Sequence, residues 1–225
     1  MDNLTLLTSK TVEDIDYCLN RGDDINQYFC HRTAFLQNCC DGNIDIVKHL
    51  IFKGCDVKLK DRRQNSNAFM LVCANGHMDL FDFFIEKNMF VIEENNDFEE
   101  NALMLACVYG QVDIVSKLLT YQFDVNIKAL FSEDYVIHRA VIGGCLEIVD
   151  LLIIHGVNLN VGNYYGDTPL HLAVYYEHKN IIERLLEMNV DTTLHNIKNQ
   201  TALMIAKNAN MLSIIKIFEE YILTP

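Results

Sequence analysis

The sequence predicts an all-α solenoid in which pairs of helices repeat along the chain. A short phrase recurs, and its clearest copy, at 166–173, reads Gly-Asp-Thr-Pro-Leu-His-Leu-Ala. The last residue of the phrase has counterparts in every unit, at Asn38, Val72, Ala106, Ala140, Ala173 and Ala206. The successive steps between these positions are 34, 34, 34, 33 and 33. A fixed period of this length is typical of proteins built by stacking one supersecondary unit.

A second phrase follows each copy of the first and consists of an acidic residue and an apolar run. Examples are Asp45-Ile46-Val47, Asp79-Leu80-Phe81, Asp113-Ile114-Val115 and Glu147-Ile148-Val149. Apolar residues then continue at helical spacing, as in Leu50 and Ile51 or Leu151 and Leu152. Each unit is therefore predicted to hold a turn, a short helix, a loop and a longer helix. One such pair cannot bury its apolar face alone, so the pairs must stack.

The period and the Thr-Pro-Leu-His-x-Ala phrase at 168–173 are similar to those of ankyrin repeats, and the chain resembles the ankyrin-repeat family over nearly its whole length. The resemblance implies one ankyrin-repeat domain, residues 1–225, with about six helix-turn-helix units and a partial N-terminal cap. The predicted divisions are a cap at 1–30, repeats at 31–64, 65–98, 99–132, 133–165 and 166–198, and a C-terminal repeat at 199–225.

The ends of the elements have their own signals. In the cap, a short helix is predicted around Leu4 to Ser9 and a second helix at Thr11 to Leu19. Thr168 is predicted to cap the helix that begins with Pro169. The long helices should end in the left-handed conformation that Gly and Asn tolerate, at Gly22, Gly54, Asn88, Gln122, Gly156 and Asn189. Gln122 is the exception, and it should cost its repeat about 1 kcal/mol.

Composition limits the partners and the compartment. The net charge is −13 and the pI is near 4.9. This balance argues against nucleic acid and against an anionic membrane, and it favours a neutral or basic protein partner. No apolar run reaches the length of a membrane span, and the first residues lack the basic start of a signal peptide. The eight cysteines then indicate a reducing compartment, and we expect a cytoplasmic monomer.

Cysteine and histidine clusters raise the question of a metal site. Cys30-His31 and Cys39-Cys40 lie close together in the sequence. However, Cys39, Cys73 and Cys107 share one repeat position, which Val141 and Val174 occupy elsewhere. A position that alternates Cys with Val is a small apolar core position, so we expect no metal and no cofactor.

Two histidines, His138 and His171, stand at one repeat position in successive units. The family resemblance implies that their rings join the turn of their own repeat to the adjoining repeat. No nucleophile–base pattern, zinc-hydrolase motif or phosphate-binding loop is visible, so the chain is not expected to be an enzyme. The acidic run at 93–100 is expected to be a solvated turn or a region that attracts a basic partner, because it lacks the ligand pattern of a calcium loop.

The resemblance also implies where a partner binds. In ankyrin-repeat proteins, partners contact the turn tips and the exposed face of the short helices. In repeats three to five these positions hold seven aromatic residues, Phe98, Tyr109, Phe131, Tyr164, Tyr165, Tyr175 and Tyr176. Tyrosine offers contact area at low entropy cost, so these seven residues are the predicted partner-binding site. The alternative interpretation is that some of the rings fold inward and stabilise the turns.

The predicted function is non-enzymatic protein binding, by a scaffold, adaptor or inhibitor that uses its concave face and turn tips. Two alternatives stay open: a Cys/His metal-dependent sensor or enzyme, and the targeting subunit of a larger enzyme assembly. The degenerate repeats look like those of ankyrin-only proteins from large DNA viruses, intracellular bacteria or protists, which implies a host partner. In the family the Asn of the Asp-Val-Asn phrase can be hydroxylated, and Asn126 and Asn160 occupy that position.

Overall fold

The computed structural model describes residues 5–89, 94–121 and 124–223. The chain forms two compact units, unit 1 (Met1–Leu105) and unit 2 (Ala106–Pro225). Helix α6 (Ala102–Val108) contains the boundary between them. None of the helices among the described residues combines the length and the apolar character needed to cross a membrane.

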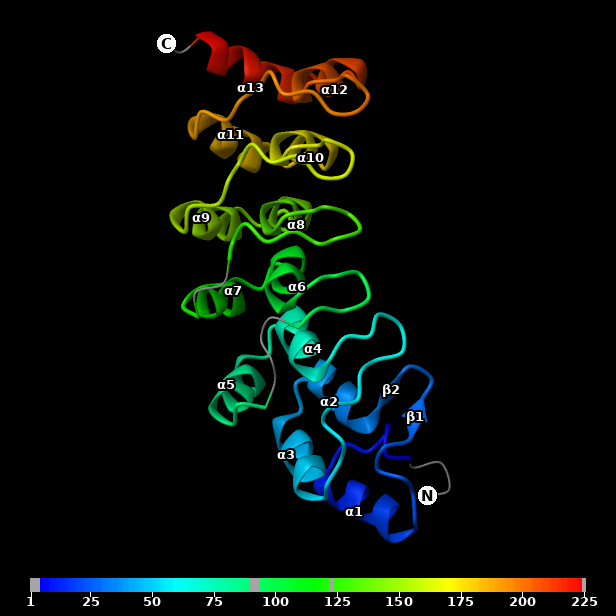
Figure 1. Ribbon diagram of the computed structural model, residues 1–225. Coiled ribbons are helices and arrows are strands. Elements are labelled where there is room, and N and C mark those ends of the chain that lie inside the picture. The colour runs from blue at the N-terminus through cyan, green and yellow to red at the C-terminus, as the bar shows by residue number, and fades with distance from the viewer. Residues whose placement is uncertain (1–4, 90–93, 122–123, 224–225) are drawn as a thin grey trace. The chain divides into compact units, whose positions relative to one another are not determined.

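Unit 1 consists of helices joined by turns, with one small hairpin (Figure 1). Before α6, its elements are α1 (Val12–Asn20), β1 (Tyr28–Phe29), β2 (Arg32–Thr33), α2 (Ala34–Asp41), α3 (Ile44–Phe52), α4 (Ala68–Asn75) and α5 (Met78–Glu86). The two strands pair antiparallel, with Tyr28 opposite Thr33 and Phe29 opposite Arg32. Helix α2 packs against both α3 and α4, and α1 packs against α3.

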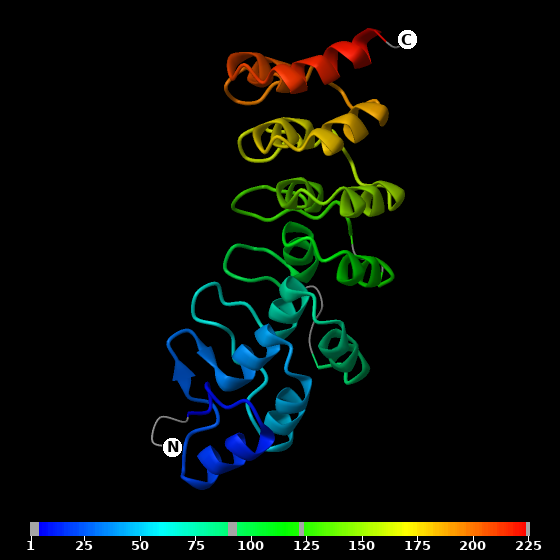
Figure 2. The ribbon, with the colours of Figure 1, turned by 180° about the vertical axis from the view of Figure 1, so that it is seen from behind.

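Unit 2 repeats the helix pair in two rows (Figure 2). After α6, its elements are α7 (Val112–Leu119), α8 (Val136–Gly143), α9 (Leu146–Ile154), α10 (Pro169–Tyr175), α11 (Lys179–Glu187), α12 (Ala202–Asn208) and α13 (Leu212–Leu223). The short helix α10 packs between α8 and α12, and α11 packs between α9 and α13. Gly143 lies where a side chain would not fit, because a Cβ there would stand 2.7 Å from the carbonyl oxygens of Cys107 and Val108.

The predicted helix pairs are present, with small differences at the ends. The cap helix predicted at Thr11 to Leu19 is α1, one residue further along. The short helix predicted around Leu4 to Ser9 is wrong for the residues described, because Thr5 to Ser9 form only a single turn. The second helix of each pair is barely longer than the first, except for α13 with its 12 residues.

The predicted left-handed helix ends are confirmed at five positions. The φ angles are positive at Gly22, Gly54, Asn88, Gly156 and Asn189. Gln122 lies outside the described residues, so its strained conformation stays a prediction. Because these residues reverse the chain after each long helix, the repeat period is set by local backbone geometry.

The shared cysteine position is part of the core, as predicted. Cys39, Cys73 and Cys107 are fully buried, as are Val141 and Val174. Burial raises the pKa of the Cys39 and Cys73 thiols well above the usual value, so these cysteines are neutral side chains that fill space.

Asn38, which occupies the last position of the recurring phrase in the first full repeat, is also buried. Its amide nitrogen donates to the carbonyl oxygen of Ala34 at 2.8 Å, and its side-chain oxygen accepts from the amide of Asn43 at 2.9 Å. A polar side chain is tolerated at this core position because both ends of the amide have partners.

His138 and His171, both in unit 2, have the structural role that the resemblance implied. Nδ1 of His171 accepts the N–H of Thr168 at 3.1 Å and lies 2.8 Å from its hydroxyl, while Nε2 lies 3.0 Å from the carbonyl oxygen of Gln200 in the next repeat. His138 does the same with the N–H of Tyr135 at 2.9 Å and the carbonyl of Val161 at 3.2 Å. Each ring therefore caps its own helix and fixes the following turn.

Candidate functional site

The turn tips of unit 1 are joined to one another by main-chain hydrogen bonds. Arg62 donates its N–H to the carbonyl oxygen of His31 at 2.8 Å, and Asp97 donates to the carbonyl of Gln64 at 2.8 Å. Three successive turns thus form one row. The bonds that join the row use only main-chain atoms, so they leave the side chains of these residues available for other contacts.

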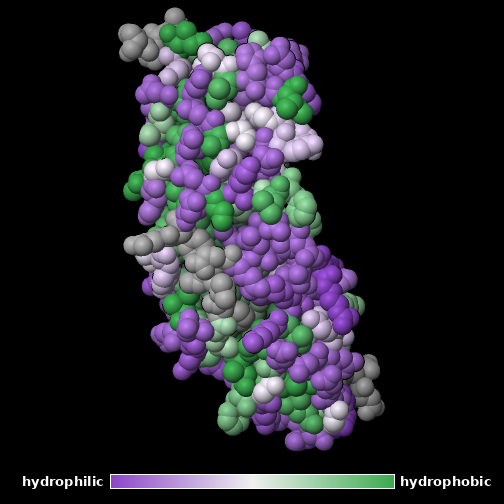
Figure 3. Space-filling model, in the orientation of Figure 1, coloured by the Kyte–Doolittle hydropathy of each residue, from purple (hydrophilic) through white to green (hydrophobic). Residues whose placement is uncertain are grey.

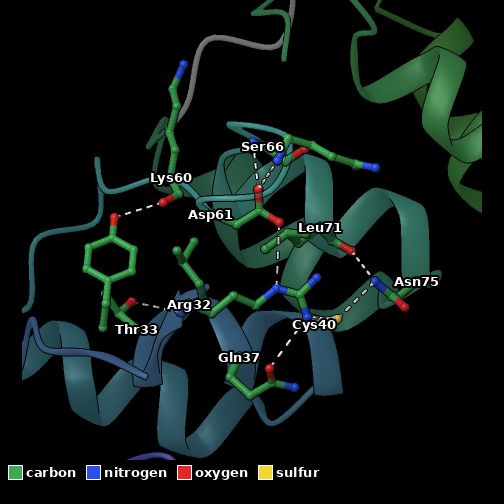
Figure 4. Close-up of polar contacts among 12 residues, drawn as sticks. Arg32, Thr33, Gln37, Cys40, Lys60, Asp61, Ser66, Leu71 and Asn75 are labelled. Atoms are coloured by element: carbon green, nitrogen blue, oxygen red, sulfur yellow. Dashed lines mark hydrogen bonds and ion pairs between the residues drawn. The ribbon is translucent and has the colours of Figure 1, made fainter. Parts of the chain in front are cut away.

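A side chain inside each turn holds its shape. Oδ1 of Asp61 accepts the N–H groups of Gln64 at 3.0 Å and Ser66 at 3.3 Å, and Figure 4 shows this carboxylate between Ser66 and Arg32. The side-chain oxygens of Asn96, Asn163 and Asn196 accept two backbone N–H groups each in the same way. Such local bonds give each turn a fixed direction.

Unit 2 joins its own turns with the same pattern. Tyr164 donates its N–H to the carbonyl of Ser132 at 3.0 Å, and Ile197 donates to the carbonyl of Tyr165 at 3.0 Å. Side chains add a second connection, since the amide of Asn196 donates to the carboxylate of Asp167 at 2.8 Å. The turns of unit 2 are therefore rigidly placed relative to one another.

The seven aromatic residues singled out from the sequence are all exposed to solvent. They are Phe98, Tyr109, Phe131, Tyr164, Tyr165, Tyr175 and Tyr176. Phe131 is the most exposed at 72%, and Tyr175 is the least at 39%. None of the rings is therefore part of the core. Phe98 lies in unit 1 and the other six lie in unit 2.

The structure brings some of the six together. The rings of Tyr164 and Tyr165 meet edge to face, with their centroids 5.3 Å apart. Tyr176 stacks on His178, with the ring centroids 6.0 Å apart. The hydroxyl of Tyr175 lies 3.4 Å from the amide nitrogen of Asn196, and partial burial raises the pKa of this phenol. Tyr175 is thus tied to the turn of the next repeat.

Two further apolar residues at the turns of unit 2 were left out of the predicted site because that site was limited to aromatic side chains. Leu130 is 69% exposed and Ile197 is 67% exposed. With Phe131, Tyr164 and Tyr165 they form what we call the aromatic tip row of unit 2. Figure 3 shows hydrophobic and intermediate surface, in green and white tones, interrupting the purple on the tip side of this unit. An apolar residue at a turn position was the signal that could have identified them.

The acidic run of unit 1 is only partly a solvated turn, and its attraction of a basic partner stays a prediction. The carboxylate of Glu94 accepts from Nδ2 of Asn67 at 2.7 Å and pairs with Nζ of Lys60 at 2.5 Å. Burial alone would raise the pKa of Glu94, but these two donors outweigh it and lower the pKa. Glu100 is buried, and Glu93 lies outside the described residues. Glu94 and Glu100 are therefore structural residues, and Asp97 is the exposed acid at this tip.

Metal-ligating side chains are not grouped in the part of the chain that the structure describes: no three His, Cys, Asp or Glu residues are placed to hold one ion. All eight cysteines are free thiols, and Cys30 is the exposed one, at the tip of the hairpin.

Comparisons with known proteins agree with this architecture. A family model described as ankyrin repeats in three copies matches residues 35–129 and 131–196. The crystal structure of the ankyrin-repeat domain of Bcl-3, described as a unique member of the IkappaB protein family, superposes with a TM-score of 0.67. The match covers 91% of this chain and 93% of that domain at 22% identity, so it shows the fold alone.

Two spider toxins are similar over a short stretch. Alpha-latrotoxin-Lt1a of Latrodectus tredecimguttatus is 40% identical over 60 residues, and alpha-latrotoxin-Lhe1a of Latrodectus hesperus is 38% identical over 60 residues. Each match covers 27% of this chain and 4% of the toxin. The similarity is thus limited to a small part of these long proteins.

Proposed function

The chain belongs to the ankyrin-repeat family, and from this premise we propose that it is a scaffold, adaptor or inhibitor that acts by occupying a protein partner. The family match and the helical architecture confirm the predicted all-α ankyrin solenoid. The ankyrin-repeat fold is a non-enzymatic scaffold for protein–protein interaction. The partner and the mode of binding are the new parts of the proposal.

The observation that carries the proposal is the aromatic tip row of unit 2. Its five side chains are exposed on turns that main-chain hydrogen bonds already hold in place. A contiguous exposed apolar surface usually marks an interaction site. Because the turns are ordered before binding, the complex loses little conformational entropy, and the burial of the rings contributes directly to affinity.

The chemistry of the row suggests the kind of contact it makes. Tyr164 and Tyr165 each offer an apolar ring and a hydroxyl, and Phe131 and Leu130 add apolar area. Such a mixture suits the apolar side chains of a partner segment flanked by hydrogen-bonding groups. The net charge of −13 favours a neutral or basic partner at longer range.

The test is an affinity capture with matched variants. The wild-type protein and a variant with Phe131, Tyr164, Tyr165 and Ile197 changed to Ala are each immobilised and exposed to candidate lysates. The control variant changes three other exposed residues of unit 2 that lie at the ends of long helices, Tyr121, Ile154 and Met188, to Ala. Bound proteins are identified by mass spectrometry.

A partner that the wild type and the control variant retain, and the tip variant loses, would support the proposal. Equal recovery by all three proteins would move the interaction away from the aromatic tip row. Loss of the partner only with the control variant would place the site on the long helices instead.

A further inference from the structure

Basic residues gather on the turn tips of unit 1, although the chain as a whole is acidic. Four of the 18 Lys and Arg residues stand at positions 58–63, between α3 and α4. They are Lys58, Lys60, Arg62 and Arg63. Lys60 is neutralised by Glu94, but Lys58, Arg62 and Arg63 are exposed and have no ion-pair partner among the described residues. Arg32 adds a guanidinium from the neighbouring hairpin, where it pairs with the carboxylate of Asp61.

Arg32 is held in a fixed orientation by three side chains. Its Nη1 lies 3.1 Å from the sulfur of Cys40 and 3.5 Å from Oε1 of Gln37, and its Nε lies 3.8 Å from the carboxylate of Asp61. Figure 4 shows the guanidinium of Arg32 lying between these partners, while the side chain of Lys60 extends away from them. The side chain of Arg32 is still 25% exposed. It is therefore a preorganised donor with one edge open to solvent.

A small hollow lies beside Arg32. Its volume is about 180 Å³, and it is lined by Phe29, Cys30, His31, Arg32, Gln37 and Arg63. Two of these residues are arginines, and no carboxylate is among them. Guanidinium groups bind carboxylates through paired N–H donors, so this lining matches a carboxylate with an adjacent apolar group that can contact Phe29.

A second, larger hollow of about 460 Å³ lies on the other side of the same turn. Arg62 forms one wall, with its guanidinium 3.7 Å from the centre of the Tyr28 ring. The Tyr28 hydroxyl donates to the carbonyl of Lys60 at 2.8 Å, so this stack is fixed as well. Lys58 lines the same hollow, but so do Asp61 and Asp97. The positive charge is therefore less concentrated here than in the smaller hollow.

We propose that Arg32, Lys58, Arg62 and Arg63, which we call the cationic tip of unit 1, bind an acidic peptide segment of a protein partner through its carboxylates. The smaller hollow takes one Asp or Glu side chain, and Arg62 and Lys58 contact the next acidic residues. The inference goes beyond the proposed function because it concerns another surface, in the other unit. The partner segment here is acidic, whereas the net charge of the chain favours a neutral or basic partner.

A carboxylate peptide fits this surface better than a nucleic acid or a phosphorylated segment. The net charge of −13 repels a polyanion, whereas a short acidic segment interacts mainly with the cations within a screening length of about 8 Å. Asp97 lies exposed at the adjoining turn, and its carboxylate opposes a dianionic phosphate more strongly than a monoanionic carboxylate.

The experiment measures binding of a fluorescein-labelled peptide with the sequence Glu-Glu-Leu-Glu-Glu-Leu to the full chain by fluorescence anisotropy. The variant Arg62→Glu/Arg63→Glu removes exposed cations, so the fold should be kept, which circular dichroism checks. The matched control is Lys198→Glu, which changes a cation of the turn next to Ile197 in unit 2. We expect the double variant to weaken binding at least tenfold and the control to change it less than twofold.

A second variant, Arg32→Lys, tests the fixed guanidinium, because it keeps the charge and removes the planar donor pair. We expect a loss of about fivefold, since an ammonium group cannot keep the contacts with Gln37, Cys40 and Asp61 that fix the orientation of the guanidinium. Equal weakening by the double variant and by Lys198→Glu would overturn the inference, as would no saturable binding by the wild type up to about 1 mM. Tight binding only of a peptide with phosphoserine in place of Glu would replace it with a phosphopeptide site.

Discussion

Units 1 and 2 build their turn tips with the same main-chain pattern and cover them with different chemistry. In unit 1 the tips carry Arg62, Arg63 and Asp97, and in unit 2 they carry Phe131, Tyr164 and Tyr165. The hydrogen bonds that join successive tips use backbone N–H and C=O groups in both units. Main-chain atoms therefore hold the row of turns together, and side chains determine the chemistry of its surface. Binding chemistry can therefore change from one unit to the other without changing the fold.

The units also differ inside the short helices. In unit 2, His138 and His171 cap their own helices and bond to the next repeat. In unit 1 the same position is Leu36, Met70 or Met104. Their N–H groups are accepted by the capping side chains of Thr33, Asn67 and Asn101. Unit 1 thus has an apolar side chain where unit 2 has a polar connection. At this position only unit 2 is sensitive to the protonation state of an imidazole.

The largest effect is expected for His171→Ala. The change removes the ring that accepts from Thr168 and bonds to Gln200, and it leaves a cavity at a residue that is 1% exposed. Buried groups without partners cost about 1–3 kcal/mol each, so we expect a loss of about 3 kcal/mol in the free energy of unfolding. Chemical denaturation measures it. Met204→Ala, at the same position in α12, is the control and should cost less than about 1 kcal/mol because Met204 is half exposed.

Gly143→Ala should come next, with a loss of about 2 kcal/mol. The added methyl group would stand 2.7 Å from two carbonyl oxygens at the end of α6, so α8 would have to move. Thermal unfolding followed by circular dichroism gives the result. Alanine at an open helical position stabilises by up to about 1 kcal/mol relative to glycine, so a gain in stability would show that this close approach is absent in solution.

Mild acid should weaken unit 2 more than unit 1. Burial lowers the pKa of His171 and of His138 below the usual value of about 6.5, so the folded state holds neutral rings. At pH values between the lowered pKa and the usual one, the unfolded chain binds more protons than the folded chain. The contribution of the two neutral rings to the free energy of unfolding is therefore fully present above a pH of about 6.5 and falls as the pH decreases below it. Hydrogen exchange at pH 7.5 and pH 5.5, corrected for the intrinsic rate, should show lost protection in α8 and α10 but not in α2 and α4. Equal loss in both units would refute the assignment to these two rings.

The smallest effect on stability is expected for Tyr165→Ala and Tyr176→Ala. Both side chains are at least half exposed, so each change should alter the free energy of unfolding by no more than about 0.5 kcal/mol. Urea denaturation of each variant against the wild type measures this. A loss of several kcal/mol would mean that the rings support the fold, and the aromatic tip row would then lose its place as a free surface.

The sequence was sufficient for features that depend on the repeat itself. The period located the helix pairs, the left-handed ends at Gly54 and Asn88, and the core position of Cys73, because each follows from local geometry repeated many times. The exposure of Tyr164 and Tyr165 was predictable for the same reason. Contacts between side chains that no repeat position specifies were not predictable from the sequence. Lys60 and Glu94 belong to successive repeats, and their pairing depends on two side chains that no repeat position specifies.

The cationic tip was missed for a similar reason. The net charge of −13 led to the expectation of a basic or neutral partner, yet an average over the chain says little about one turn. Whether Arg62 and Arg63 are neutralised depends on the neighbours that folding supplies, and in unit 1 the carboxylate of Glu94 pairs with Lys60 instead. The contacts of Arg32 with Cys40 and Gln37 likewise arise only once the hairpin and α2 have folded together.

The bonds from Tyr164 to Ser132 and from Ile197 to Tyr165 join successive turns without fixing the exact length of the repeat between them. The donor follows its acceptor by 32 residues in both of these bonds, but by 31 and by 33 residues in the corresponding bonds of Arg62 and Asp97 in unit 1, so the pattern accommodates a difference of one residue. A replaced side chain leaves every one of these bonds intact. Divergence among chains with this architecture should accordingly accumulate at the tips, as substitutions and as changes of one residue in the length of a repeat.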